Sequence, residues 1–277
     1  MRRVGLLVLF IILLTSLIIV LKSTMTTQDN NHPASQRIIS LSPAITEMLF
    51  SLDLADRVVG VTDYCDYPIQ AQNLPKVGGF INPNLEIILA LQPDVVILLN
   101  NQTKTIKHLQ QLNIKTLALK NSRLDDIKHS ISLIGDYTQH QDQALKIVSN
   151  MDKEINRIKQ KVAGLPRPKV MVTIGHSMAS EQIEQIYIAG QHDFYNDLIS
   201  ISGGRNAYTG QSLSVPSVSI EGIMQLNPEV ILDVFPEADD HQTDLVAAKK
   251  HWQSLKYIDA IQNDQVHIIE ENYATIP

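Results

Sequence analysis

Cysteine is almost absent from this sequence. Cys65 is the only one among 277 residues, so the chain forms no internal disulfide and must draw its stability from a hydrophobic core. A lone cysteine also makes a poor zinc site, because structural zinc takes about four ligands. No histidine or basic residue adjoins Cys65 in "VTDYCDYP" (61–68) to activate it as a nucleophile. We therefore predict that Cys65 is a small packing residue.

Positive charge and several sequence motifs are also scarce. The chain has 23 Lys and Arg against 29 Asp and Glu, a net charge of −6. An acidic body argues against a nucleic-acid partner, which would require a concentrated basic face. The patterns G-x-x-x-x-G-K-[ST], H-E-x-x-H and C-x-x-C do not occur. Their absence argues against a phosphate-binding loop, a zinc-protease helix and a paired-cysteine site.

The N-terminus is the one long apolar run. Arg2 and Arg3 precede residues 4–21, which carry no charge. This pattern is typical of an export signal, and the run is near the length of roughly 18 residues at which a membrane helix forms. We predict that residues 1–22 are a signal peptide or a membrane anchor, with both readings open, and that 23–36 are a polar linker. The folded body is then periplasmic, and residues 4–21 tether it to the inner membrane if they are retained as an anchor.

Strands and helices alternate along the next hundred residues. We expect strands over 37–41, 58–61 and 95–99, and helices over 44–52 and 84–91. Ser42 is a suitable N-cap and Pro43 suits the first helical position. Alternation of this kind is typical of an α/β protein with a parallel sheet covered on both faces.

A long helix is predicted from about Gln141 to Val162. Its apolar residues recur at spacings of three and four: Val148, Met151, Ile155, Ile158 and Val162. Gly164 and two prolines end it. A helix of this length spans about 30 Å, which suits a rigid connection between two lobes.

The pattern then repeats. "NLEIILALQPDVVIL" (84–98) matches "SIEGIMQLNPEVILD" (219–233) at a constant offset of 135 residues, so that Glu86 corresponds to Glu221 and Pro93 to Pro228. We predict two similar lobes with mainly parallel sheets, 37–140 and 164–277. Residues 141–163 join them, and a ligand cleft lies between them.

Ligands of open parallel sheets bind outside the carboxyl ends of the strands. The candidate ligand-binding residues at these positions are Ser42, Pro43, Tyr64, Asp66, Tyr67, Phe80 and His176. Tyrosine offers an apolar face and a polar tip. His176 could face a metal centre or haem, or could simply form a local hydrogen bond.

The segments "RIISLSPAITEMLF", "VVGVTDYCDYP", "LPKVGGFINPNLEIILALQPDVVI" and "SVSIEGIMQLNPEVI" resemble those of the Fe/B12 periplasmic-binding family. These are the substrate-binding proteins of ABC importers for vitamin B12 and iron chelates, and the vitamin B12 binders have the nearest pattern. The resemblance implies two α/β lobes bridged by a rigid helix. It also implies a monomer without catalytic activity or resident cofactor.

The resemblance also implies roles for individual residues. Tyr64 and Phe80 match positions where the family places aromatic rings against the ligand. Glu86 and Glu221 match glutamates that dock onto arginines of the permease dimer in the inner membrane, although a favourable helix dipole also accounts for acidic residues there.

The sequence departs from the family pattern at three points, of which the first two weaken the assignment of cobalamin relative to a ferric siderophore or haem. Phe80 stands where the B12 binders have tryptophan, and no aromatic residue occurs near Val215, where the second lobe of the B12 binders supplies one. The chain ends at Pro277, without the family's usual final helix.

Two other functions fit parts of the sequence. "GHSMA" (175–179) resembles the nucleophile elbow of esterases, with Ser177 as nucleophile and Asp233 and His267 in the right order for a triad. Against it, Ala179 replaces the last glycine and no oxyanion loop is evident. The other alternative is a tethered binding or sensor protein that serves no importer.

Overall fold

The computed structural model describes residues 36–176, 185–211, 214–234 and 251–269. All of these residues except Gln36 belong to the compact unit Arg37–Pro277. The predicted signal or anchor, and almost all of the predicted linker, lie outside the described residues. Within the ranges just given, no helix is both long and apolar enough to cross a membrane.

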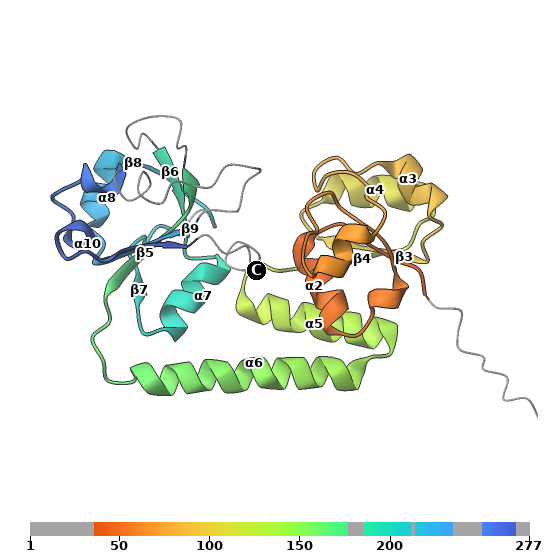
Figure 1. Ribbon diagram of the computed structural model, residues 1–277, viewed down its shortest axis with the longest axis horizontal. Helices are drawn as coiled ribbons and strands as arrows, with labels where there is room; N and C mark the ends of the chain where they lie inside the picture. The colour runs from red at the N-terminus through yellow and green to blue at the C-terminus, as the bar shows by residue number, and fades with distance from the viewer. Residues whose placement is uncertain (1–35, 177–184, 212–213, 235–250, 270–277) are drawn as a thin grey trace, which may run out of the picture. The chain divides into compact units, whose positions relative to one another are not determined.

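The first lobe is built on a parallel four-stranded sheet (Figure 1). Its strands run in the order β2-β1-β3-β4 and comprise β1 (Ile38–Ser40), β2 (Val58–Val61), β3 (Val95–Leu99) and β4 (Thr116–Leu119). The helices of this lobe are α2 (Pro43–Ser51), α3 (Leu85–Ala90), α4 (Thr103–Gln111) and α5 (Leu124–Thr138). Two short 3₁₀ helices, Ala55–Arg57 and Ile69–Asn73, lie in the connections.

Burial explains why β3 occupies the interior of this sheet. Each of its five residues, Val-Val-Ile-Leu-Leu, is buried. A strand with neighbours on both sides and helices on both faces needs a continuous apolar run rather than an alternating one. The sequence predicts this strand with the observed bounds.

The second sheet is mixed. Its strands follow the order β10-β9-β5-β6-β8, with β7 beside β5, and comprise β5 (Lys169–His176), β6 (Gln185–Ile188), β7 (Arg205–Asn206), β8 (Ser217–Ser219), β9 (Val230–Val234) and β10 (Val266–Ile269). Its helices include α7 (Phe194–Ile201), α8 (Ile220–Leu226) and α10 (Asp259–Gln262).

The strand pairs of the described residues are mainly parallel, as the sequence predicts, and the antiparallel ones are confined to β6 in this sheet. Strand β6 is antiparallel to both β5 and β8. Only eight residues separate His176 from Gln185, whereas a parallel crossover needs a dozen or more. The sequence spacing therefore requires β6 to reverse direction.

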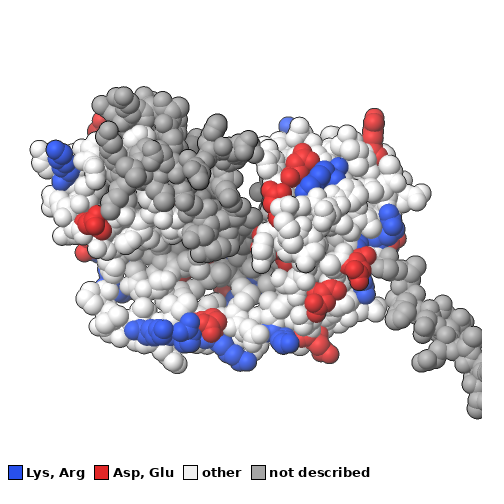
Figure 2. Space-filling model, in the orientation of Figure 1, with Lys and Arg blue, Asp and Glu red and all other residues white. Residues whose placement is uncertain are grey.

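Helix α6 (Gln141–Val162) joins the two sheets along the chain and packs beside α5 (Figure 1). A Cβ atom on Gly135 of α5 would lie 2.6 Å from the Cβ of Ala144, so this close approach requires glycine. Exposed Lys and Arg side chains gather along α6 in Figure 2, whereas its predicted apolar stripe is half-buried. The helix is therefore amphipathic, as its spacing predicts.

The internal repeat extends to individual hydrogen bonds at helix starts. Asn84 caps α3, because its side-chain oxygen accepts the backbone N–H groups of Glu86 at 3.0 Å and Ile87 at 3.1 Å. At the same repeat position Ser219 caps α8 and accepts the N–H of Gly222 at 3.3 Å. Equivalent caps start both helices in the same register.

In both lobes, equivalent hydrogen bonds also tie the end of the repeated helix to the start of a strand. Asp94 accepts the backbone N–H of Arg37 at 2.7 Å, and Glu229 accepts that of Lys169 at 2.6 Å. The Arg37 guanidinium donates to the end of α3 at 2.7 Å, and the Lys169 ammonium donates to the end of α8 at 3.0 Å. The two lobes thus share one local construction, built from an acid after the helix and a cation at the start of the lobe's first strand.

Candidate functional site

The loop after β2 alternates between exposed and buried residues. Tyr64 is 67% exposed and Tyr67 is 66% exposed, while Cys65 between them is fully buried. Asp66 is also exposed. The loop therefore turns its sulfur inward and offers two aromatic rings and a carboxylate to solvent.

Cys65 has the packing role that the sequence predicts. Its sulfur accepts a hydrogen bond from Thr46 Oγ1 at 3.2 Å and lies 3.0 Å from Thr62 Oγ1. The Lys76 ammonium donates to the Cys65 carbonyl at 3.2 Å. These contacts fix the backbone at the middle of the loop, and they therefore restrict the positions of the neighbouring tyrosines.

A second loop, residues 74–84, is joined to the first. The Asp63 N–H donates to the Gly78 carbonyl at 3.1 Å. Gly78 has a φ of +89°, which favours glycine. Two apolar side chains in these loops, which sequence reasoning missed, are largely exposed: Ile69 at 64% and Ile81 at 88%. Their only sequence signal is a large apolar residue in a turn-rich segment.

Phe80 lies in this second loop, half-buried against the core. A side chain that sequence reasoning missed, Gln102, holds it there. Gln102 is 8% exposed; its Nε2 donates to the Phe80 carbonyl at 2.7 Å and its Oε1 accepts the Leu99 N–H at 2.9 Å. One buried amide thus ties the Phe80 loop to the carboxyl end of β3.

Ser42 and Pro43 lie at the carboxyl end of β1, as predicted. Ser42 occupies the N-cap position of α2, but its side chain makes no capping bond, which corrects that part of the expectation. Its carbonyl instead accepts the Thr46 N–H at 3.0 Å and the Ser40 hydroxyl at 3.0 Å. Ser42 is only 4% exposed, and Pro43 is half-buried.

His176 is the last residue of β5, paired with Ile186 of β6. Its side chain lies outside the described part of the structure, as does Ser177. The structure thus brings Tyr64, Asp66 and Tyr67 together in one loop and ties the Phe80 loop to it. The ligand-binding role of all seven candidates stays a prediction.

The two predicted docking glutamates occupy equivalent, exposed positions. Glu86 lies in the first turn of α3 and Glu221 in the first turn of α8. The Ser219 hydroxyl donates to the Glu221 carboxylate at 2.7 Å. This hydrogen bond is the main reason that the pKa of Glu221 is lowered below its usual value.

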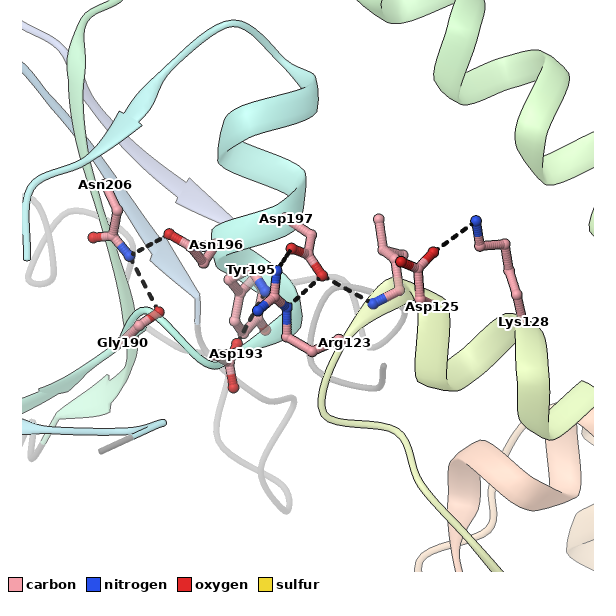
Figure 3. A network of polar contacts seen from close by, with 10 residues as sticks. Arg123, Asp125, Lys128, Gly190, Asp193, Tyr195, Asn196, Asp197 and Asn206 are labelled. Atoms are coloured by element: carbon pink, nitrogen blue, oxygen red, sulfur yellow. Dashed lines mark hydrogen bonds and ion pairs between the residues drawn. The ribbon is translucent and has the colours of Figure 1, made fainter. Parts of the chain in front are cut away.

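A polar network links the segment before α5 to α7 (Figure 3). The Arg123 guanidinium makes two hydrogen bonds to the Asp197 carboxylate, of which the one from Nε is 2.8 Å long. The same carboxylate accepts the Leu124 N–H at 3.0 Å. The hydrogen bond from Arg123 to Asp197 is the largest cause of a raised Arg123 pKa. Asp197 therefore both pairs with Arg123 and caps the start of α5.

The esterase arrangement does not form. Residues opposite each other on paired strands share a sheet face, and Asp233 lies opposite Ile268, whereas His267 lies opposite Leu232. The two side chains therefore point to opposite faces. Asp233 is fully buried and accepts from Thr173 Oγ1, and at 2.6 Å from Trp252 Nε1. Asp233 and His267 therefore do not form the acid–base pair that the esterase alternative requires.

No metal-binding group of three or more His, Cys, Asp or Glu residues gathers in the described ranges.

Comparison with known proteins addresses function more directly. Residues 38–273 match the family described as periplasmic binding protein. The vitamin B12-binding protein of Yersinia pestis (strain Pestoides F) is 27% identical over 201 residues, which cover 72% of this chain and 69% of the relative.

Two solved structures share the fold. The periplasmic vitamin B12-binding protein of Vibrio cholerae is 25% identical, with a TM-score of 0.71 over 86% of this chain and 89% of its own. The periplasmic haem-binding protein of Vibrio cholerae is 21% identical, with a TM-score of 0.74 over 88% and 92%.

The chain belongs to the periplasmic binding protein family. Its two α/β lobes joined by a helix have the architecture of that family. Family membership confirms that it is a substrate-binding protein and not an enzyme.

Proposed function

We propose that this protein captures a cobalamin or a ferric chelate, such as a siderophore complex or haem, in the periplasm and delivers it to the permease of an ABC importer. The observation that carries the proposal is the pair of exposed tyrosines in the loop after β2, Tyr64 and Tyr67. Two exposed rings in one short loop offer more aromatic contact area to a ligand than a single exposed tyrosine does. Family membership and the vitamin B12- and haem-binding relatives support the same ligand class.

The chemistry of the loops suits a large, flat, partly apolar ligand. Tyr64 and Tyr67 offer ring faces, while Asp66 supplies an exposed carboxylate. Affinity would come from buried apolar and aromatic area with a few polar contacts, helped by loops that are already fixed through Cys65 and Gln102.

A thermal-unfolding panel tests the ligand. The purified protein is heated with cyanocobalamin, haemin or a set of ferric siderophores. A ligand at 100 times its dissociation constant adds about 2.7 kcal/mol of stability, which raises the melting temperature by roughly 5–10 °C for a domain of this size. A shift with one compound names the ligand. No shift with any compound would contradict the proposed ligand class.

A matched variant pair locates the binding surface. The double substitution Tyr64→Ala and Tyr67→Ala should abolish the ligand-induced shift. The control is Tyr257→Ala, because Tyr257 is 82% exposed but lies outside both loops. Equal effects of the two variants would exclude the loop after β2 as the binding surface.

Delivery is proposed to use Glu86 and Glu221 as the contacts with permease arginines. Two equivalent carboxylates suit a partner with two equivalent halves. Glu86→Ala combined with Glu221→Ala should abolish uptake in cells while leaving the ligand-induced melting shift intact. Undiminished uptake by the double variant would overturn the docking role.

A further inference from the structure

The helices that carry the two glutamates also expose apolar side chains, and one pair of these lies at matching positions. Leu89 of α3 is 43% exposed, and Met224 of α8 is 45% exposed. The two residues are related by the same repeat offset as Glu86 and Glu221. The preceding residues, Ile88 and Ile223, are both fully buried, so the core does not need Leu89 or Met224.

Leu89 and Met224 each lie three positions after the glutamate of their helix, and residues three apart are neighbours on a helix surface. Glu86 and Leu89 therefore share one face of α3, and Glu221 and Met224 share one face of α8. Neither helix contains a lysine or arginine. On this face each helix thus presents one negative charge beside one apolar side chain, with no cation of its own. Helix α3 exposes a further apolar residue, Ile87, at 37%, but the corresponding residue of α8 is Gly222, so Ile87 is not part of the repeated pair.

We propose that Leu89 and Met224 are the apolar halves of two equivalent docking contacts. Each acidic and apolar pair fits a partner surface on which a cationic side chain borders an apolar hollow. The two pairs together fit a partner that carries this surface twice, related by a two-fold axis. The inference rests on the proposed importer function, because the partner of this description is the permease dimer.

A single exposed apolar residue is ordinary on a protein surface. The inference depends instead on the recurrence of both features, charge and apolar side chain, in two helices with equivalent caps and equivalent buried neighbours. At interfaces, desolvated apolar contacts beside a charge pair carry much of the affinity and slow dissociation.

The test measures binding of the full chain to the cognate permease–ATPase complex in lipid nanodiscs by biolayer interferometry. Leu89→Ser combined with Met224→Ser should weaken the complex about tenfold or more, chiefly through faster dissociation. Leu145→Ser is the matched control, because Leu145 is 65% exposed on α6, and it should leave binding unchanged. Equal weakening by the control, or no weakening by the double variant, overturns the inference.

The glutamate variants keep the two proposals apart. If Glu86→Ala with Glu221→Ala weakens binding but the apolar double variant does not, the importer function stands and this inference fails. If the wild-type protein does not bind the complex, both fail.

A labelling experiment does not depend on loss of affinity. Cys65 is fully buried, so a thiol introduced by Leu89→Cys can be alkylated selectively. The permease complex should protect it at least about tenfold, and it should not protect a thiol introduced by Leu145→Cys. An unprotected thiol at position 89 within a formed complex overturns the inference.

Discussion

Tyr195 of α7 has its phenol buried beside Asp193, the carboxylate that caps the helix. Burial, and secondly the charge of Asp193, raise the pKa of Tyr195 from 10.0 to about 12. The folded state therefore favours the neutral phenol, and this contribution to stability is lost as pH rises from 10 towards 12. A tyrosinate absorbance titration should show a final step near pH 12 that Tyr195→Phe lacks. A titration already complete by about pH 11 would contradict the burial effect.

The pKa of Glu221 is lowered chiefly by the hydrogen bond from the Ser219 hydroxyl. A lowered pKa keeps this carboxylate charged further into the acid range, which preserves its proposed docking charge. Ser219→Ala should raise the pKa of Glu221 towards the ordinary value of 4.5, as measured by carboxyl-carbon NMR. Ser217→Ala, at an exposed position of the same strand, is the control and should leave it unchanged. An unaltered Glu221 pKa in Ser219→Ala would exclude the hydroxyl as the cause.

At the scale of elements, Gln102 joins three segments: the Phe80 loop, the end of β3 and the start of α4. Gln102→Ala should lower the free energy of unfolding by about 1–3 kcal/mol, because it leaves the buried Leu99 N–H without an acceptor. Urea unfolding measures this change. Gln72→Ala removes an exposed amide that donates to the Asp66 carbonyl at 3.1 Å and should cost less than about 0.5 kcal/mol. Equal costs would show that Gln102 is not a structural tie.

Elements governed by local patterns could be predicted from sequence. The bounds of β2, β3 and α6 agree with those predicted from the apolar pattern. Helices α3 and α8 also lie at equivalent positions of the two lobes, as the constant offset between the repeated segments predicts. Gln102 could not be predicted, because its partners lie up to 61 residues away and nothing local marks a buried amide. Asp197 likewise pairs with Arg123 across 74 residues. Contacts of this range depend on the completed fold.

At the scale of the whole molecule, several features of the described residues connect the lobes, among them a hydrophobic cluster with members from both. Helix α6 connects them along the chain, and the pairing of Arg123 with Asp197 connects the start of α5 to α7 (Figure 3). The Asp197 carboxylate accepts hydrogen bonds from both the Arg123 guanidinium and the Leu124 N–H. Loss of Asp197 therefore leaves both a cation and a helix start without their acceptor. A stiff helix, a shared hydrophobic cluster and a polar connection together favour ligand capture with little relative motion of the lobes.

This polar connection is measurable as a coupling energy. The Arg123 side chain is 41% exposed and that of Asp197 is 16% exposed, so solvent screening reduces the pair's contribution to about 1–2 kcal/mol. A double-mutant cycle of Arg123→Ala and Asp197→Ala, measured by urea unfolding, should give a coupling in this range that decreases at high salt. The control cycle uses Asp125 and Lys128, whose ion pair lies within α5 with Asp125 92% exposed, and should give less than about 0.5 kcal/mol. Equal coupling energies in the two cycles would mean that the pair of Arg123 and Asp197 stabilises the protein no more than an ordinary surface ion pair does. Helix α6 and the shared hydrophobic cluster would then be the main restraints on lobe movement.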